Sequence, residues 1–283
     1  MHLLSFNALL LAQLGVGATT LTLGEVQAQI EAYREQERHG AHVARSAPQL
    51  GCTLACGFLA FSHPEPGKLS YPQSPAYGFE KSRYWSQQQA LTQPACRFTP
   101  SSEVDVSLAV LTSRVTQCNF AVKSGGHAAF AGASNIEGGL TLDLRNLNQV
   151  ALSADKNQTL VGAGNVWFVF ADGTIRDVSP NAYSDLYWAL RGGGNNFGIV
   201  TRFDLETYPQ GGMWAGSQTF LLTNETATSI NHAFYNLAVN SPQDPYAQII
   251  IAYAYAQNPK VYTSLHQIFT TENRLPTRLF LKT

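Results

Sequence analysis

The sequence predicts an α+β protein built in two successive regions. In the first region, a strand–helix–strand pattern from Cys96 to Lys123 is followed by a series of short strands and hairpins. In the second region, residues 214–255 again show the order strand, helix, strand, but without a sequence repeat of the first region. A chain of 283 residues, of which 45% are hydrophobic, supplies enough apolar side chains for cores of this kind.

Charged residues are scarce and nearly balanced in sign. They make up 13% of the chain, against about 25% in a typical soluble domain. The high apolar content excludes a disordered chain, which would carry few apolar residues and many charges. The formal net charge of −1 leaves no basic surface to neutralise phosphates, so no nucleic-acid partner is expected.

The N-terminus has the pattern of a secretory signal peptide. Residues from Leu3 to Ala18 include no charged side chain, and a leucine-rich run is followed by small residues. We expect residues 1–18 to be removed and the protein to be secreted and extracellular. A buried N-terminal helix is the alternative. No other apolar run approaches the length of a membrane span, so no membrane partner is expected.

The four cysteines and two sequons fit secretion. In an oxidising compartment Cys52, Cys56, Cys96 and Cys118 suggest two disulfides, with three possible connectivities. No paired His or Cys follows at zinc-site spacing, so no metal site is expected. Asn157 and Asn224 each begin a sequon and are candidate glycan sites, as in a secreted glycoprotein.

The first half of the chain predicts an extension followed by a βαβ unit. Residues 19–90 are expected to form an N-terminal extension, with a solvated helix over 25–38 that lacks a strong apolar face, and a loop-rich stretch over 62–94. Ser101–Asp105 has the pattern of a helix N-cap followed by acidic residues in the first turn. Apolar residues at 104, 108, 111 and 115 follow at helical spacing and predict a helix. Strands at 96–99 and 118–123 flank this helix, which predicts a parallel pair.

Short strands dominate the rest of the chain. Residues 140–144 alternate with period 2 and predict a strand, and Asp172-Gly173 predicts a tight hairpin turn. Ser184-Asp185 is expected to cap a short helix. Tyr253 and Tyr255 would share one strand face and serve packing. The remaining expected elements are a hairpin of 150–153 with 159–162, a hairpin of 168–170 with 174–175, a helix over 186–190, strands over 199–205, 214–222 and 247–255, and a helix over 226–239.

Two glycine-rich loops are the candidates for chemistry. Lys123-Ser124-Gly125-Gly126-His127 directly follows a predicted strand, and its backbone N–H groups can approach phosphate oxygens closely. The alternative is a tight turn with a solvated or core histidine. Arg191–Gly198 can approach an anion or a planar ring, or can be a flexible turn. It is not a dinucleotide fingerprint, because Phe197 stands at the third glycine position, which disfavours a nicotinamide-dependent enzyme.

Several motifs in order resemble a known family. They are Val122–His127, Leu142-Asp143-Leu144, Ala171–Ile175 and Asp185–Thr201. Together they resemble the secreted FAD-linked oxidases, the berberine-bridge-enzyme-like and oligosaccharide-oxidase group with the vanillyl-alcohol-oxidase (PCMH) type of FAD domain. The resemblance implies a two-subdomain FAD-binding domain over 91–210, followed by an incomplete α+β substrate domain over 211–283.

The resemblance also implies roles for particular residues. Ser124, Gly125 and Gly126 would bind the FAD pyrophosphate, Lys123 would be a further cofactor-binding residue, and His127 would bond covalently to the flavin. Gly198, Ile199 and Val200 would lie along the FAD, and Cys118 would pair with Cys52 or Cys56. The implied reaction is hydride transfer to flavin from a small molecule, a sugar, alcohol or secondary metabolite, with O₂ as the acceptor.

This sequence departs from the family pattern in two places. Val166–Phe170 runs almost directly into Asp172-Gly173. Family members carry a longer glycine-rich segment at this place, and in some of them it includes a cysteine that forms a second covalent bond to the flavin. The C-terminal part of the substrate domain is also absent, and with it the usual tyrosine base, so no catalytic residue is predicted. The alternative hypothesis is therefore a catalytically inactive, truncated or mis-spliced relative of such an oxidase.

Overall fold

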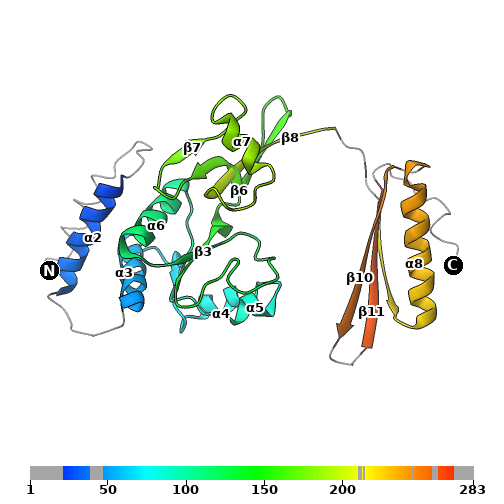
Figure 1. Ribbon diagram of the computed structural model, residues 1–283, viewed down its shortest axis with the longest axis horizontal. Coiled ribbons are helices and arrows are strands. Elements are labelled where there is room, and N and C mark those ends of the chain that lie inside the picture. Colours follow the sequence, from blue (N-terminus) through cyan, green and yellow to red (C-terminus); the bar gives the residue numbers. More distant parts are fainter. Residues whose placement is uncertain are drawn as a thin grey trace. The chain divides into compact units, whose positions relative to one another are not determined.

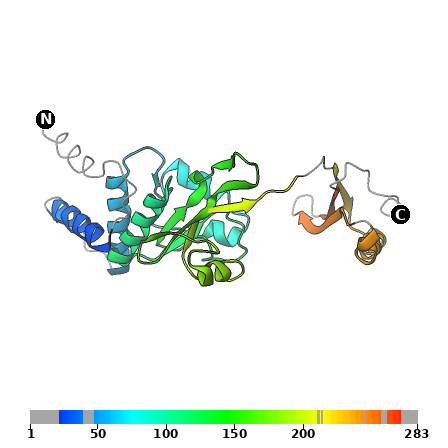
Figure 2. The same cartoon turned by 90° about the horizontal axis from the view of Figure 1, so that it is seen from above.

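The protein folds into two compact units, Met1–Thr207 and Tyr208–Thr283. The structure, a computed structural model, describes residues 22–38, 47–209, 212, 214–243, 245–256 and 261–270. Figures 1 and 2 show the elements of each unit, with colours that follow the sequence. The expected signal peptide lies outside the described residues. None of the helices in the described ranges has the length and apolar character needed to cross a membrane.

A four-stranded mixed sheet forms the centre of the first unit, in the order β1, β2, β4, β3. β2 and β3 each pair in parallel with β4, which therefore lies between the two strands that flank helix α6. The expected parallel orientation is confirmed, although the two strands are not neighbours. The strands are β1 Leu69–Ser70, β2 Cys96–Phe98, β3 Phe120–Lys123 and β4 Leu140–Asp143.

The expected strand at 140–144 is present as β4, but its burial does not alternate. All four residues of β4 are buried, because a central strand between parallel neighbours is covered on both faces. Leu144 already belongs to a short 3-10 helix, η1 (Leu144–Asn146), for which the Asp143 side chain accepts a hydrogen bond from the Arg145 N–H. The polar end of this strand thus ends the sheet and begins a turn.

Helix α6 (Glu103–Thr116) begins and ends as its sequence predicts. The Ser102 hydroxyl caps its N-terminus by accepting a hydrogen bond from the Asp105 N–H, and Gln117 closes the helix in the left-handed region. Val106, Leu108, Ala109, Val110 and Leu111 are all buried, while Val104 and Val115 are half-buried. The buried surface is therefore wider than the expected apolar stripe, since α6 packs against helices as well as strands.

Two N-terminal helices cover α6, α2 (Leu23–Arg38) and α3 (Ala47–Ser62). α2 confirms the helix expected there, but the expectation of a solvated helix without an apolar face is wrong. Val26 and Ile30 are fully buried in the core of the unit, because positions four apart share one helical face. Residues 62–94 are not purely loop, since they contain β1, α4 (Pro75–Lys81) and α5 (Gln87–Leu91).

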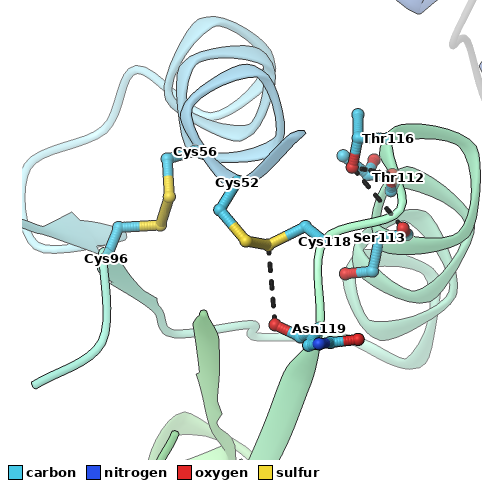
Figure 3. The surroundings of a disulfide bond; sticks show 8 residues. All are labelled: Cys52, Cys56, Cys96, Thr112, Ser113, Thr116, Cys118 and Asn119. Carbon is cyan, nitrogen blue, oxygen red and sulfur yellow. Dashed lines mark hydrogen bonds between the residues drawn. A yellow bond between two sulfur atoms is a disulfide. The ribbon is translucent and has the colours of Figure 1, made fainter. Parts of the chain in front are cut away.

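Two disulfides attach α3 to the sheet (Figure 3). Cys52 pairs with Cys118, which precedes β3, and Cys56 pairs with Cys96 at the start of β2. The two half-cystines of α3 are four residues apart and therefore lie on one face of the helix. The partner of Cys118 is thus Cys52, one of the two that the family resemblance allowed.

A second sheet completes the first unit. The long strand β6 pairs with β5 and β7 along one edge and with β8 along the other, all antiparallel. Both expected hairpins are confirmed, and the second turns at Gly173, whose carbonyl oxygen accepts a hydrogen bond from Ser107 of α6 at 2.5 Å. The strands are β5 Val150–Leu152, β6 Gln158–Val169, β7 Ile175–Asp177 and β8 Ile199–Glu206.

The helix between β7 and β8 is α7 (Ser184–Leu190). The expected cap by Ser184-Asp185 is wrong by one residue. Tyr183 occupies the N-cap in the left-handed region and makes no side-chain cap hydrogen bond. Because Ser184 already belongs to the helix, its hydroxyl is not at the cap position.

The second unit is a small α+β unit whose elements match the expected order. β9, β11 and β10 form an antiparallel sheet, with β11 in the centre. The Tyr253 hydroxyl donates to Asn231 Oδ1 of the helix at 2.8 Å, and Tyr253 and Tyr255 are each about half exposed. The elements are β9 Trp214–Leu221, α8 Asn224–Asn240, η2 Ser241–Gln243, β10 Ala247–Ala256 and β11 Val261–Thr270, of which β11 was not predicted.

Candidate functional site

Lys123 forms a buried ion pair at the end of β3. The register of the parallel pair places Lys123 opposite Asp143 of β4. The lysine Nζ lies 3.1 Å from Asp143 Oδ2 and 3.3 Å from Oδ1, and both side chains are almost fully buried. Nζ also donates to the Ser124 carbonyl oxygen at 3.4 Å. The ammonium of this predicted site residue is therefore engaged inside the protein, at the base of the glycine loop.

The next three residues divide into an outer and an inner part. Ser124 and Gly125 are exposed, and a Cβ on Gly125 would meet no atom within 4 Å. Gly126 is buried, has φ +70°, and a Cβ there would lie 3.1 Å from Lys123 Cε and 3.3 Å from Tyr84 Cδ1. Gly126 is thus the residue that packs the loop, while Ser124 and Gly125 face open space.

His127 follows at the surface and is not a core histidine. Its ring stacks on Trp85, with ring centroids 5.1 Å apart and planes 25° apart. Both residues are exposed. The loop therefore presents an accessible imidazole next to the exposed backbone of Ser124 and Gly125.

A buried cationic cluster lies beneath this loop. The Arg97 guanidinium lies over the rings of Tyr77 and Tyr84 and donates to the Tyr84 hydroxyl and to Asn135 Oδ1, both at 3.2 Å. Burial raises the pKa of Tyr84 to about 12, against the lowering effect of Arg97. The hydroxyl therefore stays protonated at neutral pH and donates to the Ser134 carbonyl oxygen at 2.9 Å.

The second glycine loop borders a pocket of about 470 Å³. The pocket is lined by residues of α7 and of the loop that follows, namely Trp188, Ala189, Arg191, Gly192, Gly193 and Phe197. Trp188 is 74% exposed, so an aromatic face is accessible there. The Arg191 guanidinium lies 4.7 Å from the centroid of the Tyr187 ring. The pocket combines aromatic surface with one cation.

Gly198 joins this loop to β8, whose first two residues are Ile199 and Val200. Ile199 is buried and Val200 half-buried, because both pair with β6. Ile199 therefore has little side-chain surface to offer a ligand, whereas Val200 keeps part of its side chain accessible. The two glycine loops belong to different sheets of the same unit, since the first follows β3 and the second precedes β8.

Sequence reasoning missed the contributions of Tyr84, Trp85 and Arg97. They lie in or next to the segment taken as an extension, and no periodic pattern marks them. Asp143 carried a signal, because it is a charged residue at the end of the apolar strand Leu140–Asp143. A lone carboxylate in a buried strand requires a partner, and Lys123 is that partner.

Comparisons with known proteins agree with these observations. The family described as "FAD binding domain" matches residues 94–177. FAD-dependent monooxygenase FUP4 of Fusarium proliferatum is 34% identical over 227 residues, covering 62% of this chain and 44% of its own length. FAD-dependent monooxygenase tpcD of Cochliobolus heterostrophus is 33% identical over 261 residues, covering 73% of this chain and 50% of its own. The chain thus spans about half the length of these relatives.

Solved structures share the fold. The BBE-like 1 protein of Physcomitrella patens superposes with a TM-score of 0.59 and 16% identity, covering 79% of this chain and 59% of its own. The xylooligosaccharide oxidase of Myceliophthora thermophila, solved with xylobiose, has a TM-score of 0.57 and 19% identity, covering 78% of this chain and 56% of its own. At these identities the likeness concerns the fold.

The matched profile and the shared fold define an FAD-binding domain of the PCMH type in an α+β chain. The cofactor of this class of domain is FAD. Residues 94–177 match this FAD-binding family, the curated relatives are named FAD-dependent monooxygenases, and the fold is the one seen in berberine-bridge-enzyme-like and oligosaccharide-oxidase structures. The resemblance inferred from the motifs is thereby confirmed.

Proposed function

We propose that the loop Lys123–His127 binds the pyrophosphate of FAD and that Gly198–Val200 contacts the same cofactor. The observation that carries this proposal is the division of the first loop. Gly126 packs inward, while Ser124 and the open face of Gly125 leave backbone N–H groups accessible. Such a nest of N–H groups binds phosphate oxygens, and the lysine beneath it holds the loop in place.

His127 is proposed as the covalent attachment point of the flavin. Its imidazole is exposed beside the loop, so a ring nitrogen can reach a ligand bound there. FAD supplies a two-electron acceptor when it is bound. The part of this chain is to bind and orient the cofactor and, through a histidine attachment, to prevent its loss.

The proposed activity is a flavin-dependent oxidation of a sugar, alcohol or secondary metabolite, with O₂ as the final acceptor. Support comes from the relatives, which are named as FAD-dependent monooxygenases and as a xylooligosaccharide oxidase. The pocket beside α7 offers the exposed aromatic face of Trp188, which suits an uncharged substrate. We assign no catalytic base.

The flavin content of the purified chain tests cofactor binding and attachment separately. We expect a yellow protein with flavin absorbance, whose colour stays in the pellet after acid precipitation because of the bond to His127. His127→Gln should move the colour to the supernatant. A wild-type protein that carries no flavin, and takes up none when FAD is added, would contradict the proposed function.

Catalytic competence requires a second measurement, because the alternative is an inactive relative that still folds. The flavin-loaded protein is reduced chemically and then exposed to air. Rapid reoxidation with formation of hydrogen peroxide supports an oxidase. Flavin that binds but reoxidises no faster than free FAD supports the inactive alternative.

We further propose that the protein is secreted and glycosylated. Two disulfides fit an oxidising compartment, and Asn157 and Asn224 are both exposed, in the β5–β6 turn and the first turn of α8. Expressed in a eukaryotic host, the protein should appear in the medium and shift in mobility after glycan removal. Asn157→Gln and Asn224→Gln should each remove part of that shift. Retention of an unglycosylated chain in the cytosol would contradict secretion.

A further inference from the structure

A short segment of the N-terminal extension binds the end of the candidate FAD loop and the chain that follows it as far as Ser134. The Trp85 N–H donates to the Gly126 carbonyl oxygen at 3.1 Å. The Ser86 hydroxyl donates to the Ala129 carbonyl oxygen at 2.7 Å, and the Tyr84 hydroxyl to that of Ser134 at 2.9 Å. Three consecutive residues, Tyr84, Trp85 and Ser86, therefore bind successive parts of the chain that follows β3.

The side chain of Trp85 makes a contact of a different kind. It is 65% exposed, yet its ring stacks on that of His127. An indole exposed to this extent adds little to a hydrophobic core. The stack restricts the orientation of the imidazole, because the Trp85 backbone is itself hydrogen-bonded to Gly126, the residue before His127. The contact orients a group rather than stabilising the interior.

We propose that Trp85 is a positioning residue for His127 and that Tyr84–Ser86 is a functional part of the cofactor site. The family match begins at residue 94, so it does not assign these residues. The inference rests on the proposed function, because it takes His127 as the group that meets FAD. Trp85 holds the imidazole beside the exposed loop before the cofactor arrives, which lowers the entropy lost on binding.

Variants of Trp85 test this role in apo-protein produced under flavin starvation, so that FAD binding is measured before the proposed bond to His127 forms. Trp85→Ala should weaken FAD binding about tenfold through loss of a single aromatic stack and the ordering that it provides. Trp85→Phe should restore most of the affinity, because a phenyl ring can still stack on the imidazole. Phe79→Ala is the matched control. Phe79 is an aromatic residue of α4 in the same extension, 61% exposed, whose ring faces Arg83. Phe79→Ala should bind FAD as the wild type does.

A readout without cofactor separates positioning from folding. In the apo-protein, the ring protons of His127, assigned with His127→Gln, should show an upfield ring-current shift that Trp85→Ala removes and Phe79→Ala keeps. The thermal midpoint of unfolding should be unchanged in Trp85→Ala, Trp85→Phe and Phe79→Ala, because the substituted side chains are exposed.

Three outcomes would overturn the inference. An unchanged His127 shift in Trp85→Ala means that the rings do not stack in solution. Equal FAD affinity of Trp85→Ala and wild type means that the stack does not position the histidine, while the proposed function stands. A wild-type chain that binds no FAD removes the proposed function and this inference together.

Discussion

Replacing Lys123 with methionine is expected to lower the free energy of unfolding by about 3–5 kcal/mol, because it leaves a buried carboxylate without its cation. Lys123 and Asp143 are 4% and 1% exposed, and the two carboxylate oxygens lie 3.1 and 3.3 Å from the ammonium. A methionine fills a similar volume, so the loss is one of charge compensation. Chemical denaturation of the apo-protein measures it.

Two further variants identify the cause of that loss. Adding Asp143→Asn to Lys123→Met removes the unpaired charge and should recover a large part of the stability. Lys68→Met breaks the ion pair with Asp105, and this pair is more exposed than that of Lys123. Ser101 and Ser102 also donate hydrogen bonds to the Asp105 carboxylate, so a smaller loss of stability is expected. If the double variant is no more stable than Lys123→Met, the ion pair is not what holds the strand ends together.

Gly125→Leu is expected to weaken FAD binding about a hundredfold while leaving the thermal midpoint unchanged. A Cβ on Gly125 meets no protein atom within 4 Å, so the fold tolerates a side chain there. The same open space is where the proposed function places the pyrophosphate. A clash that costs about 3 kcal/mol weakens binding by about a hundredfold. Titration with FAD and a thermal melt measure the two effects.

Gly78→Leu is the matched control. Gly78 is also exposed, and a Cβ there likewise meets no atom within 4 Å, but it lies in α4 and outside the candidate site. The Gly78→Leu variant should bind FAD with wild-type affinity. Normal binding by Gly125→Leu would show that the phosphate does not approach this side of the loop.

Local elements were predictable because their signals are local. Ser102 and Asp105 mark the start of α6, and Asp172-Gly173 marks the β6–β7 turn, so each was found from a few adjacent residues. The glycine loop after β3 was found in the same way. The predictions that were wrong concern burial and end positions. The face of α2 is buried by core residues far along the chain, whereas α7 begins one residue earlier than expected, after Tyr183 in the left-handed region.

The candidate site shows the same division. Its outer part, Ser124 to His127, is one continuous motif and was visible in the sequence. Its supporting part is not, because Tyr84, Trp85 and Arg97 come from the extension and from β2, some 26 to 43 residues before the loop that they support. Nothing in their spacing indicates that they meet.

The sequence by itself determined the class of fold, most of the strand and helix order between β2 and β10, the glycine loops and the resemblance to FAD-linked oxidases, since each is encoded by short contiguous patterns. Only the tertiary structure decided which cysteines pair, that Lys123 faces Asp143, and that Trp85 stacks on His127. The physical reason is that strand order and helix packing bring these side chains together. Both depend on the burial of the whole core rather than on any local segment.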